Sequence, residues 1–330
     1  MVGLGAEPDL FVPPAIVSAA PRAAASPRAS VRSAELGVLL VMLVWAGNYV
    51  VVKVAVSQTA PAGFNFLRML VAAIPLLAVL YARTGSVALP RRDVFAIAGL
   101  GAIGLSAYQL LWGTALVTTS AGESALIIGA APALIALIAA LVGVDRFTWG
   151  KALGVTTALV GIAFVVSAQG GFRLDAVGLG DALTLGAALC WATYIAVGTP
   201  MFRRVPAVAA AAWAVTFGAI WLIPFAVPDL VADPGSYLQP GPVLALAYSA
   251  FLAVALSQVL VARAIPALGP IRFANIQFIL PPLTVVLGAI VLGEAIRAGE
   301  VVGGAIIIVG VLISRRDASL PARLRRLRPA

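Results

Sequence analysis

The chain has 330 residues and a formal net charge of +9; 62% of its residues are apolar and only 11% are charged. Soluble domains carry about a quarter of charged residues, so the polar side chains here are too few to cover one or two water-soluble domains. The mean hydropathy of +1.06 agrees with this view. The composition therefore excludes a soluble globular protein and predicts a polytopic membrane protein.

The residue types that are missing exclude several chemistries. The sequence contains no histidine, which excludes a Ser-His-Asp triad, zinc or haem bound through His, and a His proton relay. Cys190 is the single cysteine, so neither an intrachain disulfide nor a Cys-x-x-Cys redox or metal site can form. We therefore expect no metal ion and no cofactor.

The chain divides into two tails and a series of apolar stretches. Residues 1–33, rich in Ala, Pro, Ser and Arg, are predicted to be a disordered cytoplasmic tail, and residues 315–330 form a basic cytoplasmic tail. The stretches between them are long enough to cross a bilayer core of about 30 Å as helices. They predict an all-α membrane protein with ten transmembrane helices, at roughly residues 35–56, 63–83, 93–116, 122–143, 150–168, 178–199, 206–227, 242–264, 270–291 and 298–314.

The positive charges indicate how these helices are oriented. Most of the 22 Lys and Arg residues fall in the two tails and in the alternate loops on the same side. Because cytoplasmic loops are enriched in Lys and Arg, we predict a multi-pass protein of the cell (inner) membrane with both termini in the cytoplasm. The net charge of +9 is then explained by the orientation in the membrane, and we expect no nucleic acid as partner. The basic C-terminal cluster is expected to contact membrane lipid.

An internal repeat is the most informative feature of the sequence. One constant shift along the chain places Gln109 on Gln258 and Pro132 on Pro281. The same shift aligns the glycines of two later spans, Gly150, Gly154 and Gly161 with Gly299, Gly303 and Gly310. Each repeat, residues 34–168 and 178–314, contains five predicted spans. Since five is odd, the second copy enters from the opposite side, which predicts the inverted repeats found in secondary transporters.

Polar and aromatic residues near the centres of predicted spans are candidates for substrate binding, because such residues are costly in a bilayer. In the first repeat these are Trp45, Asn48, Tyr108, Gln109 and Trp112. In the second repeat they are Trp191, Tyr194 and Gln258. Aromatic faces and amides would suit a small amphipathic solute. Helix packing and interhelical hydrogen bonds are the alternative roles.

Other positions leave two interpretations open. Arg68, about 7 Å inside the second span at 1.5 Å per residue, could receive a substrate carboxylate or extend toward water, and the same applies to Lys53. Asn275 and Gln277 are two residues apart, so at most one of them is expected to line a cavity. Pro132 and Pro281 should kink their helices and serve either as hinges or as static bends.

The order of these motifs resembles the EamA-type branch of the drug/metabolite transporter superfamily over about residues 36 to 314. The resemblance rests on the following motifs: Trp45-Ala-Gly-Asn48 through Lys53, Phe66-Leu-Arg68, Pro132 to Val144-Asp145-Arg146, Gly154 to Gly161, Leu189-Cys-Trp191-Ala, and Pro281 through Leu292-Gly-Glu294 to Gly303 and Gly310. It implies ten-helix carriers that work by alternating access, many of which export amino acids or other small metabolites. Val144-Asp145 departs from the Gly-Glu usual in the family.

The sequence therefore predicts a secondary transporter of a small metabolite, with amino acid export as the first guess. No carboxylate stands at mid-membrane, which favours facilitated diffusion or exchange, with Glu123 or Asp181 as the fallback sites for proton coupling. A channel or a non-transporting scaffold is the alternative, and the glycine-rich helices leave a homodimer open. An intramembrane enzyme is disfavoured because such chemistry usually needs a buried His, a paired carboxylate or a metal.

Overall fold

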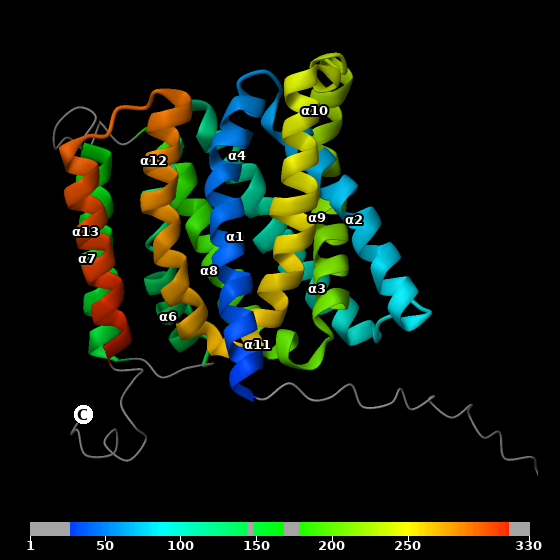
Figure 1. The fold of residues 1–330 in the computed structure, drawn as a ribbon, viewed down its shortest axis with the longest axis horizontal. Coiled ribbons are helices and arrows are strands. Elements are labelled where there is room, and N and C mark those ends of the chain that lie inside the picture. Colours follow the sequence, from blue (N-terminus) through cyan, green and yellow to red (C-terminus); the bar gives the residue numbers. More distant parts are fainter. Residues whose placement is uncertain (1–26, 144–147, 168–177, 317–330) are drawn as a thin grey trace, which may run out of the picture.

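The computed structural model describes residues 27–143, 148–167 and 178–316, and Asp145 with both outer tail segments lies outside them. These residues form one bundle of roughly parallel helices (Figure 1), with no strand in the ranges given. The α-helices are α1 (Pro27–Val56), α2 (Pro61–Thr84), α3 (Arg91–Gly101), α4 (Tyr108–Thr118), α5 (Ala121–Ile128), α6 (Ala131–Leu141), α7 (Trp149–Ser167), α8 (Leu179–Arg204), α9 (Ala207–Ala232), α10 (Pro240–Ala247), α11 (Ser257–Ile276), α12 (Leu280–Leu292) and α13 (Ala298–Arg316). Four short segments of other helical type are η1 (Ala102–Ala107), η3 (Ser236–Leu238), η4 (Tyr248–Leu256) and η5 (Gln277–Ile279).

The all-α class is confirmed, and the helices are long and apolar enough for a membrane. Eight continuous helical stretches meet the length and hydropathy needed to cross a bilayer. They cover Val31–Val56, Pro61–Thr84, Arg91–Thr118, Ala121–Leu141, Trp149–Ser167, Leu179–Arg204, Ala207–Ala232 and Pro240–Leu268. Two shorter apolar helices, Gln277–Leu292 and Ala298–Ile313, lie where the ninth and tenth spans were predicted.

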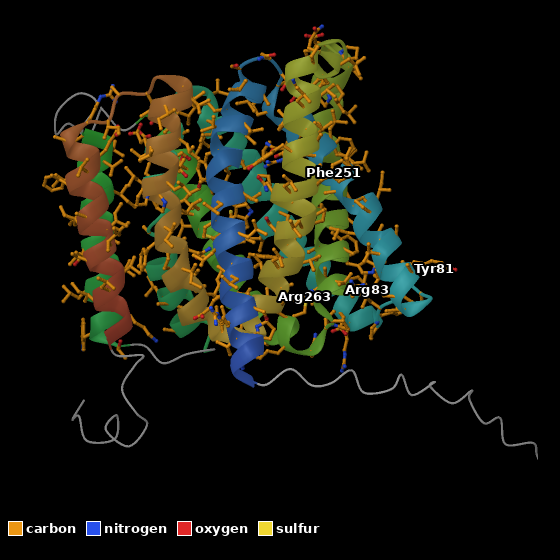
Figure 2. The ribbon with its side chains drawn as sticks, in the orientation of Figure 1. Tyr81, Arg83, Phe251 and Arg263 are labelled. Carbon is orange, nitrogen blue, oxygen red and sulfur yellow. The ribbon has the colours of Figure 1, made fainter. Side chains whose placement is uncertain are left out.

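Both ends of the described chain lie at the same face of the bundle. In Figure 1, α1 begins and α13 ends at the lower edge, which we call the terminal face; the end of α1 at Val56 lies at the opposite face. Arg83 and Arg263 lie in the part of the bundle nearer the terminal face (Figure 2). There Arg204 at the end of α8 also pairs with Asp93 in the first turn of α3, with 2.5 Å between Nη2 and Oδ1. Basic residues thus accumulate at this face.

Two helices contain a π-helical segment at matching points of the proposed repeats. Segment η1 lies between α3 and α4, and η4 lies between α10 and α11. At each segment a serine hydroxyl donates five residues back: Ser106 within η1 to the Gly101 carbonyl at 3.3 Å, and Ser257, the first residue of α11, to that of Leu252 at 2.9 Å. Such segments are rare and frequently mark functional sites. Gln109 and Gln258 each lie two residues after the end of these segments.

Two further helices are interrupted just before a proline. Helix α5 ends at Ile128, and Pro132 lies in the first turn of α6; segment η5 precedes α12, where Pro281 takes the equivalent position. Proline has no N–H and clashes with the turn before it, so it fits the first turn of a new helix better than the middle of an old one. The sequence predicted kinks here, and the structure has a turn at residues 129–130 before α6 and the 3-10 segment η5 before α12.

Glycines bring α7 and α13 into close backbone contact at one end of the bundle (Figure 1). A Cβ atom on Gly161 would lie 2.7 Å from the carbonyl oxygen of Gly303, and one on Gly303 would lie 2.6 Å from that of Gly161. Gly310 approaches the Gly154 carbonyl in the same way. The glycine-rich helix faces, which the sequence analysis offered as a possible homodimer interface, therefore pack against each other within one chain.

We expect Gly161→Ala to lower the apparent melting temperature in detergent, because the added methyl group must push the Gly303 backbone away. Overpacking of this kind costs about 1–3 kcal/mol. Gly99→Ala is the matched control, since a Cβ at Gly99 has open space around it. Thermal unfolding of the two purified variants checks this, and equal melting temperatures would contradict the close contact.

Candidate functional site

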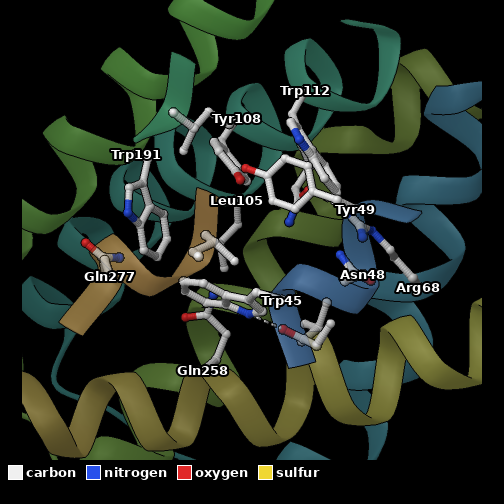
Figure 3. Close-up of a pocket in the computed structure, with 15 residues that line it drawn as sticks. Trp45, Asn48, Tyr49, Arg68, Leu105, Tyr108, Trp112, Trp191, Gln258 and Gln277 are labelled. Atoms are coloured by element: carbon white, nitrogen blue, oxygen red, sulfur yellow. Dashed lines mark hydrogen bonds between the residues drawn. The ribbon is translucent and has the colours of Figure 1, made fainter. Parts of the chain in front are cut away.

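A cavity of about 60 Å³ lies inside the bundle where the π-helical segments and the helix breaks meet. Its lining comes from both halves of the chain: Trp45, Asn48, Tyr49, Arg68, Leu105, Tyr108, Gln109, Trp112, Ile128, Trp191, Ala253, Val254, Gln258, Gln277 and Leu280 (Figure 3). A space of this size holds a few water molecules, at about 10–15 Å³ of probe volume each. The cavity therefore has little free space in this conformation.

Aromatic rings form an arc around the cavity. Trp45 meets Trp191 edge-on at 5.5 Å between ring centroids, and Trp191 contacts Tyr108 at 5.7 Å. Tyr108 stacks on Trp112 at 6.1 Å, and Trp112 meets Tyr49 edge-on at 5.0 Å. Rings at these separations attract one another beyond the area they bury. The arc gives the cavity a rigid, largely apolar wall.

The π-helical segment η4 fixes α1 next to this wall. The Trp45 Nε1–H donates to the carbonyl oxygen of Ala253 in η4 at 3.0 Å (Figure 3). In the other direction, the Tyr248 hydroxyl donates to the Val44 carbonyl at 2.9 Å. Gly47 allows this approach, because a Cβ there would lie 2.6 Å from the Tyr248 hydroxyl oxygen. Helix α1 of the first half and η4 of the second therefore hold each other in place.

Arg68 is the buried charge of the site, with 0% of its surface exposed. Its Nη1 donates to the Ser249 hydroxyl at 2.9 Å, and its Nη2 donates to Oε1 of Gln109. The Ser249 hydroxyl in turn donates to Oδ1 of Asn48 at 2.5 Å. The guanidinium carbon also lies 5.3 Å from the centre of the Trp112 ring. Arg68 thus connects α2 to η4, α4 and α1.

The neighbours of Arg68 are neutral. Within the part of the chain that the structure describes, ion pairs are formed by Arg92, Arg204 and Arg297, and no carboxylate pairs with Arg68. The Nε–H of Arg68 is buried and has no hydrogen-bond partner there. A buried charge normally requires an opposite charge or full hydrogen bonding. The cavity therefore carries a positive charge that its described side chains do not neutralise.

All the predicted binding residues except Tyr194 line this cavity. Tyr194 packs behind Trp191, with 5.5 Å between ring centroids, and against Phe202 at 5.4 Å. It fills the space over Gly104, where a Cβ would lie 2.3 Å from the ring. The packing therefore does not support a substrate contact for Tyr194, because its ring lies against Gly104 of η1 and outside the cavity lining.

The sequence reasoning missed the lining residue Tyr49 and the Arg68 partner Ser249, and it left the choice between Asn275 and Gln277 open. Tyr49 lies four residues after Trp45 on the same face of α1, so helical spacing could have found it. Gln277 lines the cavity, and its Oε1 is buried without a described partner; the side chain of Asn275 lies outside the description. No pattern in the sequence marked Ser249, which is brought to Arg68 only by the fold.

A second polar group lies at the opposite face, where α4 ends and α5 begins. The Nζ of Lys53 donates to the carbonyls of Leu116 at 3.0 Å and Thr119 at 2.7 Å, so Lys53 binds the end of α4 and does not line the cavity. The carboxylate of Glu294 accepts the N–H groups of Ala121 at 2.8 Å and Gly122 at 3.2 Å. Opposite charges thus stabilise the two helix ends.

Backbone geometry explains how Glu294 reaches α5. Gly293 ends α12 with a positive φ of 69°, a conformation that glycine adopts without steric cost, and the chain turns back after it. Asp181 and the fully buried Glu123 also lie at this face; Asp181 accepts the Thr119 hydroxyl at 3.3 Å. The fallback coupling residues therefore belong to this second group and not to the cavity.

A bundle of long apolar helices around a polar and aromatic cavity, built from both halves of the chain, is the structure of a membrane transport protein. Comparison with known proteins gives the family. The chain belongs to the EamA-like transporter family, whose profile matches residues 32–167 and again residues 178–316. The resemblance suggested by the motifs is thus confirmed.

Relatives align along nearly the whole of their own lengths. A probable terminal-alkyne amino-acid exporter of Streptantibioticus cattleyicolor is 29% identical, over 86% of this chain and 96% of its own. A probable amino-acid metabolite efflux pump of Salmonella typhimurium is 24% identical, over 84% and 92%. A solved structure with 21% identity superimposes with a TM-score of 0.60 over 90% of this chain and 99% of its own, which shows a shared fold.

We expect Ser249→Ala to destabilise the protein, because the buried Arg68 Nη1 loses its hydroxyl partner. A buried donor left unsatisfied costs about 1–3 kcal/mol, and more when it is charged. Ser167→Ala is the control, since Ser167 only bonds back to Ala163 and Phe164 of its own helix. Thermal unfolding in the same detergent checks this; a loss no larger than that of the control would contradict it.

Proposed function

We propose that the protein is a secondary transporter that moves a small amphipathic metabolite through the central cavity by alternating access. The observation that carries this proposal is the cavity itself, which lies inside the bundle and takes its lining from both halves. A cavity of about 60 Å³ is too small for an amino acid. The conformation described here would then be nearly occluded, and the helices must separate to admit solute.

The proposed architecture is ten spans in two inverted five-helix repeats, with the tails outside them. Three observations support it. The family profile matches twice in succession. The π-helical segments and the proline breaks recur at equivalent positions of the two halves. The pairs in closest contact, α2 with α9 and α7 with α13, join equivalent second and fifth spans.

We place the protein in the cell (inner) membrane with the terminal face in the cytoplasm. The support is the accumulation of basic residues at that face, including Arg83, Arg204 and Arg263, as expected for cytoplasmic loops. Apolar side chains with more than half their surface exposed, such as Phe95 and Val301, would face lipid.

Closure of the opposite, extracellular face is assigned to Lys53 and Glu294. Lys53 of α1 binds the end of α4 within the first half, and Glu294, which follows α12, binds the start of α5 and so ties the second half to the first. Opening toward the outside would break these bonds. Pro132 and Pro281 lie where α5–α6 and η5–α12 are interrupted, and the missing backbone hydrogen bonds make these breaks suitable hinges.

Export of amino acids or related compounds is the proposed physiological role. Two relatives, over almost their whole lengths, are described as probable exporters of amino acids or their metabolites. Transport is proposed to be facilitated diffusion or exchange, because the described acidic residues lie near helix ends. Glu123 and Asp181, both at the opposite face, are the coupling sites if protons are moved.

We expect Trp191→Ala and Gln109→Ala to lower transport at least severalfold while expression is preserved. Both side chains line the cavity, and Gln109 also holds Arg68. Trp149→Ala is the control, because Trp149 is 84% exposed at the start of α7. Uptake and counterflow in proteoliposomes are the measurements, and counterflow also separates a carrier from a channel or a scaffold. Normal transport by both cavity variants would contradict the site.

Glu294→Gln should loosen the opposite face, because a neutral amide stabilises a helix N-terminus less well than a carboxylate does. We expect faster backbone amide exchange in residues 119–124, measured by mass spectrometry. Asp233→Asn provides an acidic control at the same face, away from α5. Unchanged exchange in residues 119–124 would show that the carboxylate does not hold this junction closed.

A further inference from the structure

We propose that Arg68 is the receptor for a carboxylate group of the transported solute, so that the substrate class is a small organic acid, amino acids included, with an apolar or aromatic body. This inference rests on the proposed function and deepens it. It follows from three properties of Arg68: its burial, its unused hydrogen-bonding capacity and the chemistry of its surroundings.

Arg68 is buried as a charge without a described counter-ion. It is 0% exposed, and its hydrogen bonds go to a serine hydroxyl and an amide oxygen, which are neutral. A guanidinium stays protonated in proteins, so it cannot escape the cost of burial by losing its charge. An anion that enters the cavity would remove this cost, and a neutral or cationic solute would not.

The guanidinium also has donors to spare. It carries five N–H groups, and the two hydrogen bonds to Ser249 and Gln109 account for two of them. The Nε–H is buried and unpartnered in the described part of the chain. Arginine and a carboxylate match as planar groups that form two parallel hydrogen bonds. A carboxylate therefore uses donors that the protein leaves free.

The partners of Arg68 keep it in place without neutralising it. Ser249 is fixed by its own donation to Asn48, and Gln109 is fixed by the Arg68 contact after the π-helical segment η1. An acidic partner in either position would have satisfied the charge permanently and left no reason to bind an anion. Neutral partners orient the guanidinium and leave the charge available, which is a preorganised receptor.

The rest of the cavity determines the body of the solute. Arg68 and Asn48 lie at one end in Figure 3, and Trp45 and Trp191 extend from there toward Gln277. The faces of these rings offer a large apolar contact area for the part of the solute that lies away from the Arg68 charge. The described lining contains no acidic side chain, so an ammonium group would meet only amide oxygens and rings. The carboxylate is thus the group that decides recognition.

The test compares acids with their amides on the purified, full-length protein. The probes are L-phenylalanine, L-phenylalaninamide, 3-phenylpropionate and 3-phenylpropionamide at equal ionic strength, and the readout is the shift in melting temperature, because a ligand of the folded state raises it. We expect both acids to raise the melting temperature by several degrees and both amides to leave it unchanged. Equal shifts from an acid and its amide would overturn the inference.

Substitutions then assign the effect to Arg68. Arg68→Gln should weaken the apparent affinity for the acids by about tenfold or more, as expected when one partner of a buried charge pair is removed. Arg68→Lys keeps the charge but not the planar donors and should recover part of the binding. Arg83→Gln is the control, since Arg83 is exposed near the terminal face and lies outside the cavity lining. Unchanged acid binding by Arg68→Gln would contradict the proposal.

Two outcomes separate this inference from the proposed function. If proteoliposomes accumulate amides or amines and not acids, the protein is a transporter and the role given to Arg68 is wrong. If no solute of the panel binds or moves, both proposals fail. If Arg68→Gln does not fold, the comparison of each acid with its amide on the unmodified protein still tests whether the site recognises a carboxylate, because that comparison needs no variant.

Discussion

The burial of one positive charge inside an apolar bundle is the constraint on which the site depends. Arg68 is completely enclosed, and the free energy of removing a guanidinium from water must be offset by its surroundings. Its described neighbours are hydroxyl, amide and aromatic groups from α1, α2, α4 and η4. These four elements can meet only if the two halves of the chain pack in one specific way.

Irregular backbone is what makes such a meeting possible. Regular helices satisfy their own N–H and C=O groups and present only side chains to one another. Here the π-helical segments and the interruptions before Pro132 and Pro281 contribute residues to the cavity lining. The carbonyl of Ala253, in η4, accepts the Trp45 indole N–H. The cavity is located where the departures from ideal helix coincide.

The sequence predicted much of this arrangement, for identifiable reasons. Apolar stretches give the helices, because a bilayer allows few other structures. A polar residue in an apolar span is conspicuous, which is why Gln109, Gln258 and Arg68 were found. Tyr194 was assigned to the lining because it lies near the middle of the sixth predicted span, but in the structure its ring packs over Gly104. Ser249 escaped notice, since a serine in a helix is inexpensive and common.

The sequence by itself determined that this is a helical membrane protein of a transporter family. Hydropathy and repeated motifs depend only on the order of residues along the chain, so they can be recognised without a structure. The tertiary structure decided which side chains share a cavity and which charges have partners. The partners of Arg68 and Lys53 come from residues far apart in the chain, so interhelical packing decides them. Lys53 binds the carbonyls at the end of α4, whereas Arg68 contacts a serine hydroxyl and an amide oxygen.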